Sequence, residues 1–123
     1  MILLDTNAVL WLQSGHPRAL PLLNKRGRLY ASPVSLLDLQ LLVEVGRLGL
    51  KPGVDLVDLM HDDRWLMDDP PAVGWFERAL ALPWARDPFD RLLVAHAQFR
   101  GWRLATGDSS ILAESDSSRC IEL

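Results

Sequence analysis

Short apolar runs alternate along the chain with longer segments of helical periodicity. Residues 1–4 and 29–31 are continuous apolar runs, which is typical of strands buried on both faces of a parallel sheet. The other expected strands are residues 64–67, 103–106 and 120–123. Apolar positions recurring at three and four residues, bounded by caps and turn residues, predict helices over 6–14, 18–24, 36–48, 56–60, 73–80 and 89–100. The alternation predicts an α/β fold, a parallel sheet flanked by helices on both faces.

The length of 123 residues suits one domain, and no repeat or linker divides the chain, so we expect a single domain over residues 1–123. No apolar run approaches the roughly 20 residues of a membrane helix. The opening residues have no basic segment before the apolar run and no cleavage site, so they do not resemble a signal peptide. We expect a soluble, cytoplasmic protein without a membrane partner.

Charge and cysteine content exclude several functions. Lys and Arg total 13 against 16 Asp and Glu, a net charge of -3, which disfavours a broadly basic nucleic-acid binder. A local basic face stays possible. Cys120 is the only cysteine, so an internal disulfide and a zinc site built from several thiolates are excluded.

Acidic residues follow several of the expected strands. The carboxyl ends of parallel strands meet at one edge of a sheet, where ligands of open α/β sheets bind. Carboxylates gathered there repel one another unless a cation intervenes, and Mg²⁺ or Mn²⁺ prefers oxygen ligands. Such a site can hydrolyse a phosphodiester by activating water. The acids in question are Asp5, Asp38, Asp87, Asp90 and Asp108.

Each acid also has a purely structural interpretation. Asp5 can cap the helix that follows it. Asp38 fits the third helical position after a Ser35 cap, in the manner of a capping box. Either Asp87 or Asp90 can cap the next helix, and Asp108 can be a turn residue. Their joint placement at strand ends, rather than any single residue, favours a site.

Other candidates are weaker. The three histidines have no metal-ligand spacing, and we expect His96 to be a core or surface residue. The pairs Asp62-Asp63 and Asp68-Asp69 are expected to be solvated surface. No nucleophile elbow, phosphate-binding loop or dinucleotide fingerprint occurs.

Four segments, in order, resemble the PIN-domain nucleases, and among them the VapC-type toxins of bacterial type II toxin-antitoxin pairs. They are residues 3–7 (LLDTN), 32–38 (SPVSLLD), 86–97 (RDPFDRLLVAHA) and 104–108 (LATGD). The resemblance spans nearly the whole chain. It implies a PIN-like parallel sheet flanked by helices and a metal-dependent endoribonuclease that uses Mg²⁺ or Mn²⁺.

The resemblance also assigns roles to residues. Asp5, Asp90 and Asp108 match the acids that hold the metal and the activated water. Asp38 falls where the family usually has Glu, one methylene longer. Thr6, Asn7 and Asp87 are expected to support these acids, and Arg91 and Arg86 are candidate RNA contacts; Lys25, Arg26 and Arg28 are weaker candidates.

The resemblance implies three partners: an RNA substrate, a second copy of the chain in a homodimer, and an antitoxin that blocks the acidic site, often with an inserted Arg. An Arg fork pairs bidentately with carboxylates, which explains the blocking physically. Trp11 and Trp75 are candidates for the antitoxin or dimer face, although core burial is favoured for both.

Two alternatives stay open at this point. One is a weak or inactive PIN scaffold that binds RNA or protein without cleaving, because Asp38 replaces the usual Glu. The other is a phosphoacceptor receiver domain, which also gathers acids at strand ends. A receiver usually needs an adjacent acidic pair after its first strand and a late lysine, whereas the only lysines are Lys25 and Lys51.

Overall fold

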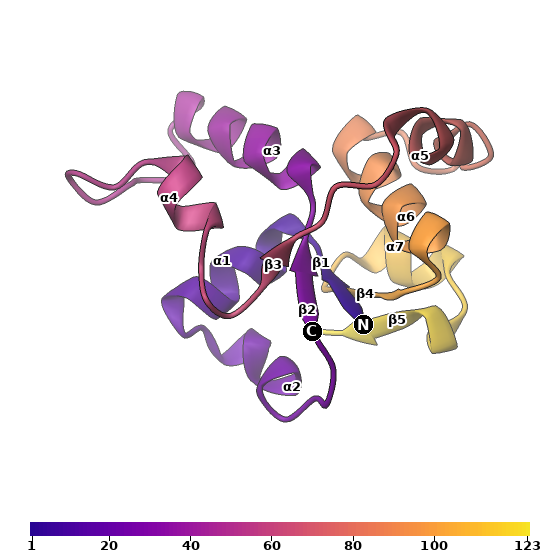
Figure 1. The fold of residues 1–123 in the computed structure, drawn as a ribbon, viewed down its shortest axis with the longest axis horizontal. Coiled ribbons are helices and arrows are strands. Elements are labelled where there is room, and N and C mark those ends of the chain that lie inside the picture. The colour runs from indigo at the N-terminus through magenta and orange to yellow at the C-terminus, as the bar shows by residue number, and fades with distance from the viewer.

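The computed structural model describes residues 1–123 and contains one five-stranded parallel sheet (Figure 1). The strand order is β3-β2-β1-β4-β5, so the N-terminal strand lies at the centre. In the register of β1 and β4, Leu4 is opposite Ala105. The strands are β1 (Ile2–Leu4), β2 (Leu29–Ala31), β3 (Leu66–Met67), β4 (Arg103–Thr106) and β5 (Cys120–Glu122). The predicted α/β class is confirmed.

Helices cover both faces of the sheet. The α-helices are α1 (Thr6–Ser14), α2 (Leu20–Leu23), α3 (Pro33–Glu44), α4 (Leu56–Met60), α5 (Ala72–Ala79), α6 (Pro88–Arg100) and α7 (Ser109–Glu114). Two 3₁₀ turns, η1 (Pro17–Ala19) and η2 (Ser117–Arg119), precede α2 and β5. In Figure 1, α1 to α4 gather on one side of the molecule and α5 to α7 on the other. None of these helices is long and apolar enough to cross a membrane.

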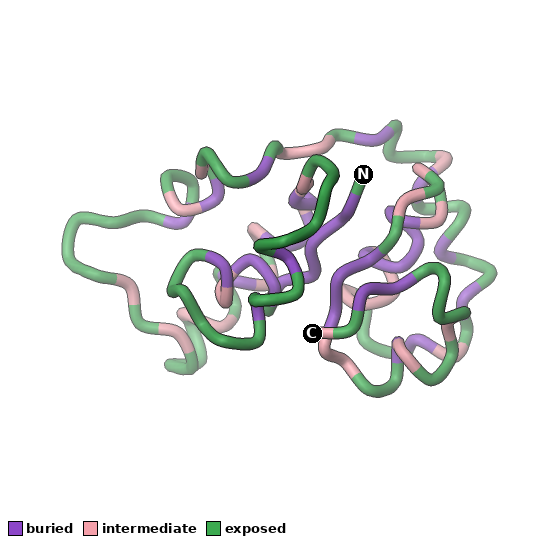
Figure 2. Tube along the Cα trace, turned by 90° about the horizontal axis from the view of Figure 1, so that it is seen from below, coloured by how far each residue is buried: buried purple, intermediate pink, exposed green.

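The sheet separates two hydrophobic cores, because successive side chains of a strand point to opposite faces. Ile2 and Leu4 belong to the core under α1 to α4, while Leu3 belongs to the core under α5 to α7. Figure 2 shows the buried segments running through the middle of the molecule and the exposed turns outside them. All three β1 side chains named here are buried, as the unbroken apolar run predicts.

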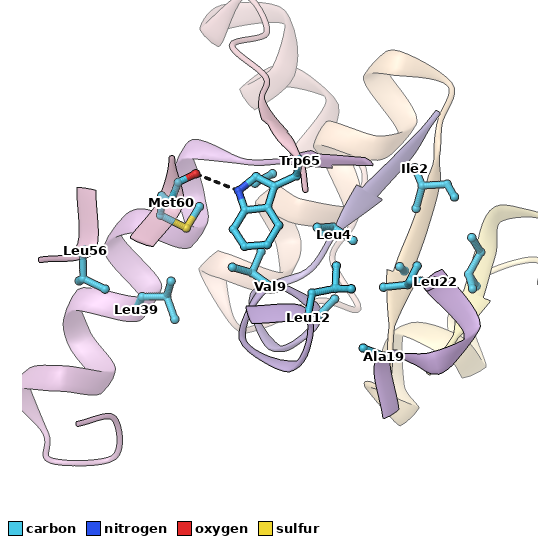
Figure 3. Packing of buried hydrophobic residues seen from close by; sticks show 14 residues of the cluster. Ile2, Leu4, Val9, Leu12, Ala19, Leu22, Leu39, Leu56, Met60 and Trp65 are labelled. Atoms are coloured by element: carbon cyan, nitrogen blue, oxygen red, sulfur yellow. Dashed lines mark hydrogen bonds between the residues drawn. The ribbon is translucent and has the colours of Figure 1, made fainter. Parts of the chain in front are cut away.

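Tryptophans anchor both cores. Trp65 packs with Val9 and Met60, and its indole N–H donates a hydrogen bond to the Met60 carbonyl at 2.8 Å (Figure 3). Trp75 is buried on the other face and donates to the Leu92 carbonyl at 2.8 Å. The favoured expectation of core burial for Trp75 is therefore confirmed, whereas Trp11 is only partly buried.

The predicted start of the long helix is wrong by three residues. Ser32, not Ser35, is its N-cap, and the Ser32 hydroxyl accepts a hydrogen bond from the Val34 amide at 3.3 Å. Pro33 occupies the first helical position, where its fixed φ and missing N–H cost nothing. The helix also ends at Glu44 rather than at residue 48, because Gly46 adopts a φ of +76° that ends the helical path.

Other boundaries differ from expectation in smaller ways. Helix α7 was missing from the predicted elements, where Gly107 and Asp108 were read only as an exit turn. The segment expected to form one helix over 18–24 is divided into η1 and α2. Strand β3 has two residues instead of four. These differences leave the order of strands and the edge at which they end unchanged.

Candidate active site

Four aspartates from four separate elements line one small cavity at the carboxyl edge of the sheet. Asp5 follows β1, Asp38 lies in α3, Asp90 lies in the first turn of α6, and Asp108 follows β4. The cavity has a volume of about 150 Å³. Its full lining is Asp5, Thr6, Asn7, Asp38, Leu42, Asp90 and Asp108, with no cationic side chain.

Asp5 is both a helix cap and a member of the cavity. Its backbone N–H donates to the Ala105 carbonyl at 3.1 Å, which extends the β1–β4 pairing by one residue. Its Oδ1 accepts a hydrogen bond from the Ala8 amide at 2.7 Å, closing the first turn of α1. Asp5 is only 5% exposed. Capping α1 therefore does not keep this side chain out of the cavity.

Asp87 caps helix α6, whereas Asp90 lines the acidic cavity. Asp87 caps α6, because its Oδ1 accepts from the amides of Phe89 at 2.8 Å and Asp90 at 3.2 Å. The Asp90 carboxylate makes no hydrogen bond or ion pair with a side chain and lines the acidic cavity. Asp108 caps α7 through the Ile111 amide at 2.9 Å and still lines the same cavity.

Asp38 reaches the cavity from the middle of a helix. It is the sixth residue of α3, not the third, so the capping-box explanation for it is wrong. Ser35, which that explanation needed as the cap, instead lies 3.1 Å from the Thr6 hydroxyl across the contact between α1 and α3. No local structural role accounts for an acid at position 38.

Burial and mutual repulsion raise the pKa values of three of these acids. Burial is the larger cause for Asp5, whose pKa is raised to about 6 although the Thr106 hydroxyl and the Ala8 amide oppose the shift. Burial, followed by repulsion from Asp87 and the three other cavity acids, raises the pKa of Asp90 to about 7. Burial also raises the pKa of Asp38, against the lowering effect of the Thr6 hydroxyl.

The donor set fits a hard divalent cation. Its ligands are all oxygen, and gathered carboxylates with raised pKa values need either protons or a cation to compensate their charge. No three His, Cys, Asp or Glu side chains stand close enough to hold an ion without rearrangement. The chemistry of the cavity therefore fits a metal ion, while its side chains are not drawn together into a finished coordination sphere.

The other residues that the sequence predicts for the site lie around this cavity in different ways. Thr6 and Asn7 line it, and Asp87 lines an adjoining cavity of about 290 Å³ together with Arg86. The two cavities share Asp90 and Asp108. Arg91 lines neither: its Nε donates to the Ala79 carbonyl at 2.7 Å, at the C-terminal end of α5.

A second polar cluster was missed by sequence reasoning. We call it the His96 cluster, made of Ser32, Asp68, His96 and Arg100. His96 is fully buried, with Nε2 at 2.7 Å from Asp68 and Nδ1 at 2.9 Å from the Ser32 hydroxyl. Asp68 also accepts two hydrogen bonds from Arg100, at 2.8 and 3.1 Å. Of the two places expected for His96, core or surface, the structure shows the core, and the expectation that Asp68 is solvated surface is wrong.

The sequence matches the PIN-domain family model over residues 2–114, and the chain therefore belongs to the PIN-domain family. The matched region contains all four cavity acids. A search of curated proteins finds no significant match.

Solved structures with the same fold include a toxin-antitoxin complex and other assemblies. VapBC2 from Rickettsia felis, bound to a DNA fragment from its promoter, is 20% identical with a TM-score of 0.69, over 100% of this chain and 99% of that one. A toxin-antitoxin complex from Klebsiella pneumoniae is 17% identical with a TM-score of 0.69 over 100% of both chains. FitAcB from Neisseria gonorrhoeae is 25% identical with a TM-score of 0.54 over 92% of both.

Proposed function

We propose that this PIN-domain protein is a divalent-metal-dependent endoribonuclease and the VapC-type toxin of a type II toxin-antitoxin pair. One observation carries the proposal: four aspartates from four elements line a single cavity that holds no cationic side chain. Family membership supports nuclease activity, and the toxin-antitoxin complex among the structural neighbours supports the biological role.

In this proposal Asp5, Asp90, Asp108 and Asp38 hold Mg²⁺ or Mn²⁺. When bound, the ion supplies a water of lowered pKa and charge compensation at the scissile RNA phosphate. Asp5 and Asp108 are fixed by the helix amides that they cap, so their free oxygens keep a constant direction. Thr6, the first residue of α1, is proposed to orient Asp38 through its hydroxyl, and Asp87 fixes the first turn that carries Asp90. Asn7 and Arg86 are proposed to contact RNA beside these acids.

The antitoxin is proposed to cover the acidic cavity and the helix next to it. Helix α3, which supplies Asp38, also exposes Leu37 and Leu41, and Val45 directly after the helix is exposed as well. An inserted Arg from the antitoxin would compensate the cavity carboxylates, and apolar side chains beside it would cover these residues. A cytoplasmic location follows from this role.

A homodimer is proposed on the family resemblance. Val73 and Phe76 in α5 and Leu80 directly after it are 72%, 50% and 76% exposed. Exposed apolar groups of this kind mark interaction surfaces. Light scattering of the purified chain at several concentrations tests the assembly: a constant mass near 13.8 kDa, the mass of one chain, would contradict a dimer.

Cleavage of RNA by the purified, antitoxin-free protein tests the proposed activity. The substrates are tRNA, rRNA and synthetic single strands, each with Mg²⁺, Mn²⁺ or chelator. We expect chelator-sensitive cleavage whose rate falls by at least about 100-fold in Asp5→Asn and Asp90→Asn. Removal of a metal ligand should cost more than removal of a residue that only hydrogen-bonds to a ligand, which typically costs about 10- to 100-fold. Asp63→Asn, an exposed acid outside the cavity, is the matched control and keeps full activity. Equal cleavage by Asp90→Asn would overturn the assignment.

A PIN scaffold that binds without cleaving is the second candidate. It is favoured by the shorter Asp38 side chain and by the absence of a ready group of three metal-holding side chains. RNA binding by the folded protein with no cleavage under any condition supports it. In that case Asp38→Glu, which restores the family's usual side chain length, separates the two candidates: cleavage gained by this variant means an attenuated nuclease.

A further inference from the structure

An arginine that no motif singles out lies against the turn carrying Asp108. Arg18, in η1, contacts Gly107 so closely that a Cβ built at Gly107 would lie 2.5 Å from Nη2 of Arg18. The same Cβ would lie 3.0 Å from Cη2 of Trp11. Only glycine permits this approach, because any side chain at 107 would displace the guanidinium. A cation therefore stands one residue from a cavity acid.

The guanidinium of Arg18 is held in place by two contacts. Its Cζ lies 4.3 Å from the centroid of the Trp11 ring, a cation–π arrangement. Its Nη2 donates a hydrogen bond to the Leu123 carbonyl at 3.0 Å. The start of η1 is fixed as well, because the Arg18 amide donates a hydrogen bond to Nδ1 of His16. The His16 ring stacks on the Trp11 ring, with 5.6 Å between the ring centroids. The position of this side chain is thus set by its neighbours before any ligand arrives.

Most of the binding capacity of Arg18 is unused. A guanidinium has five N–H donors, and a single side-chain hydrogen bond is made here. None of the ion pairs of the protein includes Arg18, and the residue is exposed. An ordered, solvent-facing cation with free donors next to a group of acids is suited to bind an anion that the acids alone would repel.

The other arginines near the site are placed differently. Arg91 is occupied by the Ala79 and Leu80 carbonyls at the end of α5. Arg86 lines the cavity adjoining Asp90 and Asp108, so it approaches from the loop before α6. Arg18 contacts Gly107, the residue before Asp108, from the segment between α1 and α2. Cations from two unrelated segments therefore reach the neighbourhood of the same acid.

We propose that Arg18, ordered on Trp11 over the Gly107 turn, binds a phosphate of the RNA substrate next to the scissile one. This inference rests on the proposed ribonuclease function and adds a substrate-binding residue to it. RNA phosphates need cationic contacts near the cavity, because the chain carries a net charge of -3 and the only charged side chains that line the cavity are acids. The planar fork of Arg18 provides such a contact without further ordering of the side chain.

Binding of RNA at several salt concentrations tests this role. The probe is a fluorescein-labelled single-stranded RNA 20-mer of mixed sequence, measured by anisotropy with Mg²⁺ in an Asp5→Asn background, with intact RNA verified on a gel. The slope of log K against log salt is negative, and loss of one phosphate contact should make it less steep by about 0.7 for a single strand. Arg18→Gln should therefore bind about fivefold more weakly at 0.1 M salt. Arg47→Gln, an exposed arginine without side-chain partners, is the matched control and should match the parent.

Each outcome separates this inference from the proposed function. Unchanged affinity and slope in Arg18→Gln, with a parent that binds RNA, would overturn the role of Arg18 and leave the ribonuclease assignment standing. Weaker binding at an unchanged slope would mean that Arg18 only braces the turn, which also overturns the phosphate contact. No binding by the parent would contradict the proposed function itself, and the inference with it. If Arg18→Gln fails to fold, Arg18→Met keeps the packing on Trp11 while removing the charge, and the same fall in slope is expected.

Discussion

The acidic cavity and the His96 cluster both join polar side chains that are far apart in the sequence, but their charges are balanced in opposite ways. In the His96 cluster, hydrogen bonds from Arg100 and His96 lower the pKa of Asp68 despite its partial burial, and the Arg100 guanidinium compensates its charge. In the cavity, burial and neighbouring carboxylates raise the pKa of Asp90 to about 7. A polar cluster whose charges and hydrogen bonds are satisfied within the chain serves the fold. A polar cluster whose charges are not compensated within the chain is a candidate site for binding a ligand of opposite charge.

The largest effect should come from removing the centre of the satisfied cluster. His96→Ala leaves a cavity in the core and removes hydrogen bonds to Ser32 and Asp68, so we expect a loss of about 3 kcal/mol in the free energy of unfolding. Urea denaturation followed by circular dichroism measures it. A loss under 1 kcal/mol would show that the cluster does not stabilise the fold as its geometry indicates.

The acidic cavity should destabilise the metal-free protein as the pH rises. Carboxyls with folded pKa values near 6 and 7 and unfolded values near 3.8 hold more protons when folded, so their contribution to stability is lost as the pH rises from about 4 to about 7. His96 has the opposite sign, because burial lowers its pKa and its contribution is lost on acidification. A comparison of two variants that both contain His96 removes that opposing contribution.

We therefore expect Asp90→Asn in chelator to be more stable than wild type at pH 8, by about 2 kcal/mol. The rise in the pKa of Asp90 from 3.8 to about 7 corresponds to about 4 kcal/mol, which solvent screening of this half-buried carboxyl and the lost helix-dipole interaction reduce by about half. The difference should shrink towards pH 5, where Asp90 is largely protonated in the wild type. Thermal denaturation at both pH values, with Asp63→Asn as the control, measures it. A wild type that is more stable than Asp90→Asn at pH 8 without metal would mean that the cavity carboxylates are compensated within the protein.

A smaller effect separates two adjacent aspartates. Asp68→Asn weakens the hydrogen bonds from His96 and Arg100, and we expect it to lower the free energy of unfolding by about 1.5 kcal/mol. The loss is smaller than for a fully buried ion pair because Arg100 is partly exposed. Asp69→Asn, at an exposed position, should stay within about 0.5 kcal/mol of wild type. Equal losses in the two variants would place the effect in the turn before α5 and not in the cluster.

The sequence allowed the acidic cavity to be anticipated better than the His96 cluster, for a physical reason. In a parallel sheet every strand ends at the same edge, so an Asp after β1 and one after β4 are brought together by topology alone. Asp68 and His96 are 28 residues apart and meet through the packing of α6 against the segment after β3, which no local pattern encodes. The contact of Arg18 with Gly107 was hidden in the same way.

Helix ends were harder to predict than strands. Ser32 and Ser35 are both good caps, and the pattern of α3 fits either start. The structure selects Ser32, with Pro33 in the first turn, and Ser35 is instead drawn to Thr6 in the packed interior. Helix α7 was missed because Asp108 was read as a turn residue alone, although it caps the helix. For α3 a tertiary contact decided between two local options, whereas for α7 the local cap was present in the sequence and was overlooked.

Titration of the metal-free protein with Mg²⁺ and Mn²⁺ at pH 8 by calorimetry tests the central claim, that the acidic cavity is a divalent-cation site. We predict saturable binding in wild type and in Asp63→Asn, and an affinity at least about tenfold lower in Asp90→Asn. Binding that is equal in wild type and Asp90→Asn, or no binding to any of the three proteins, would contradict it.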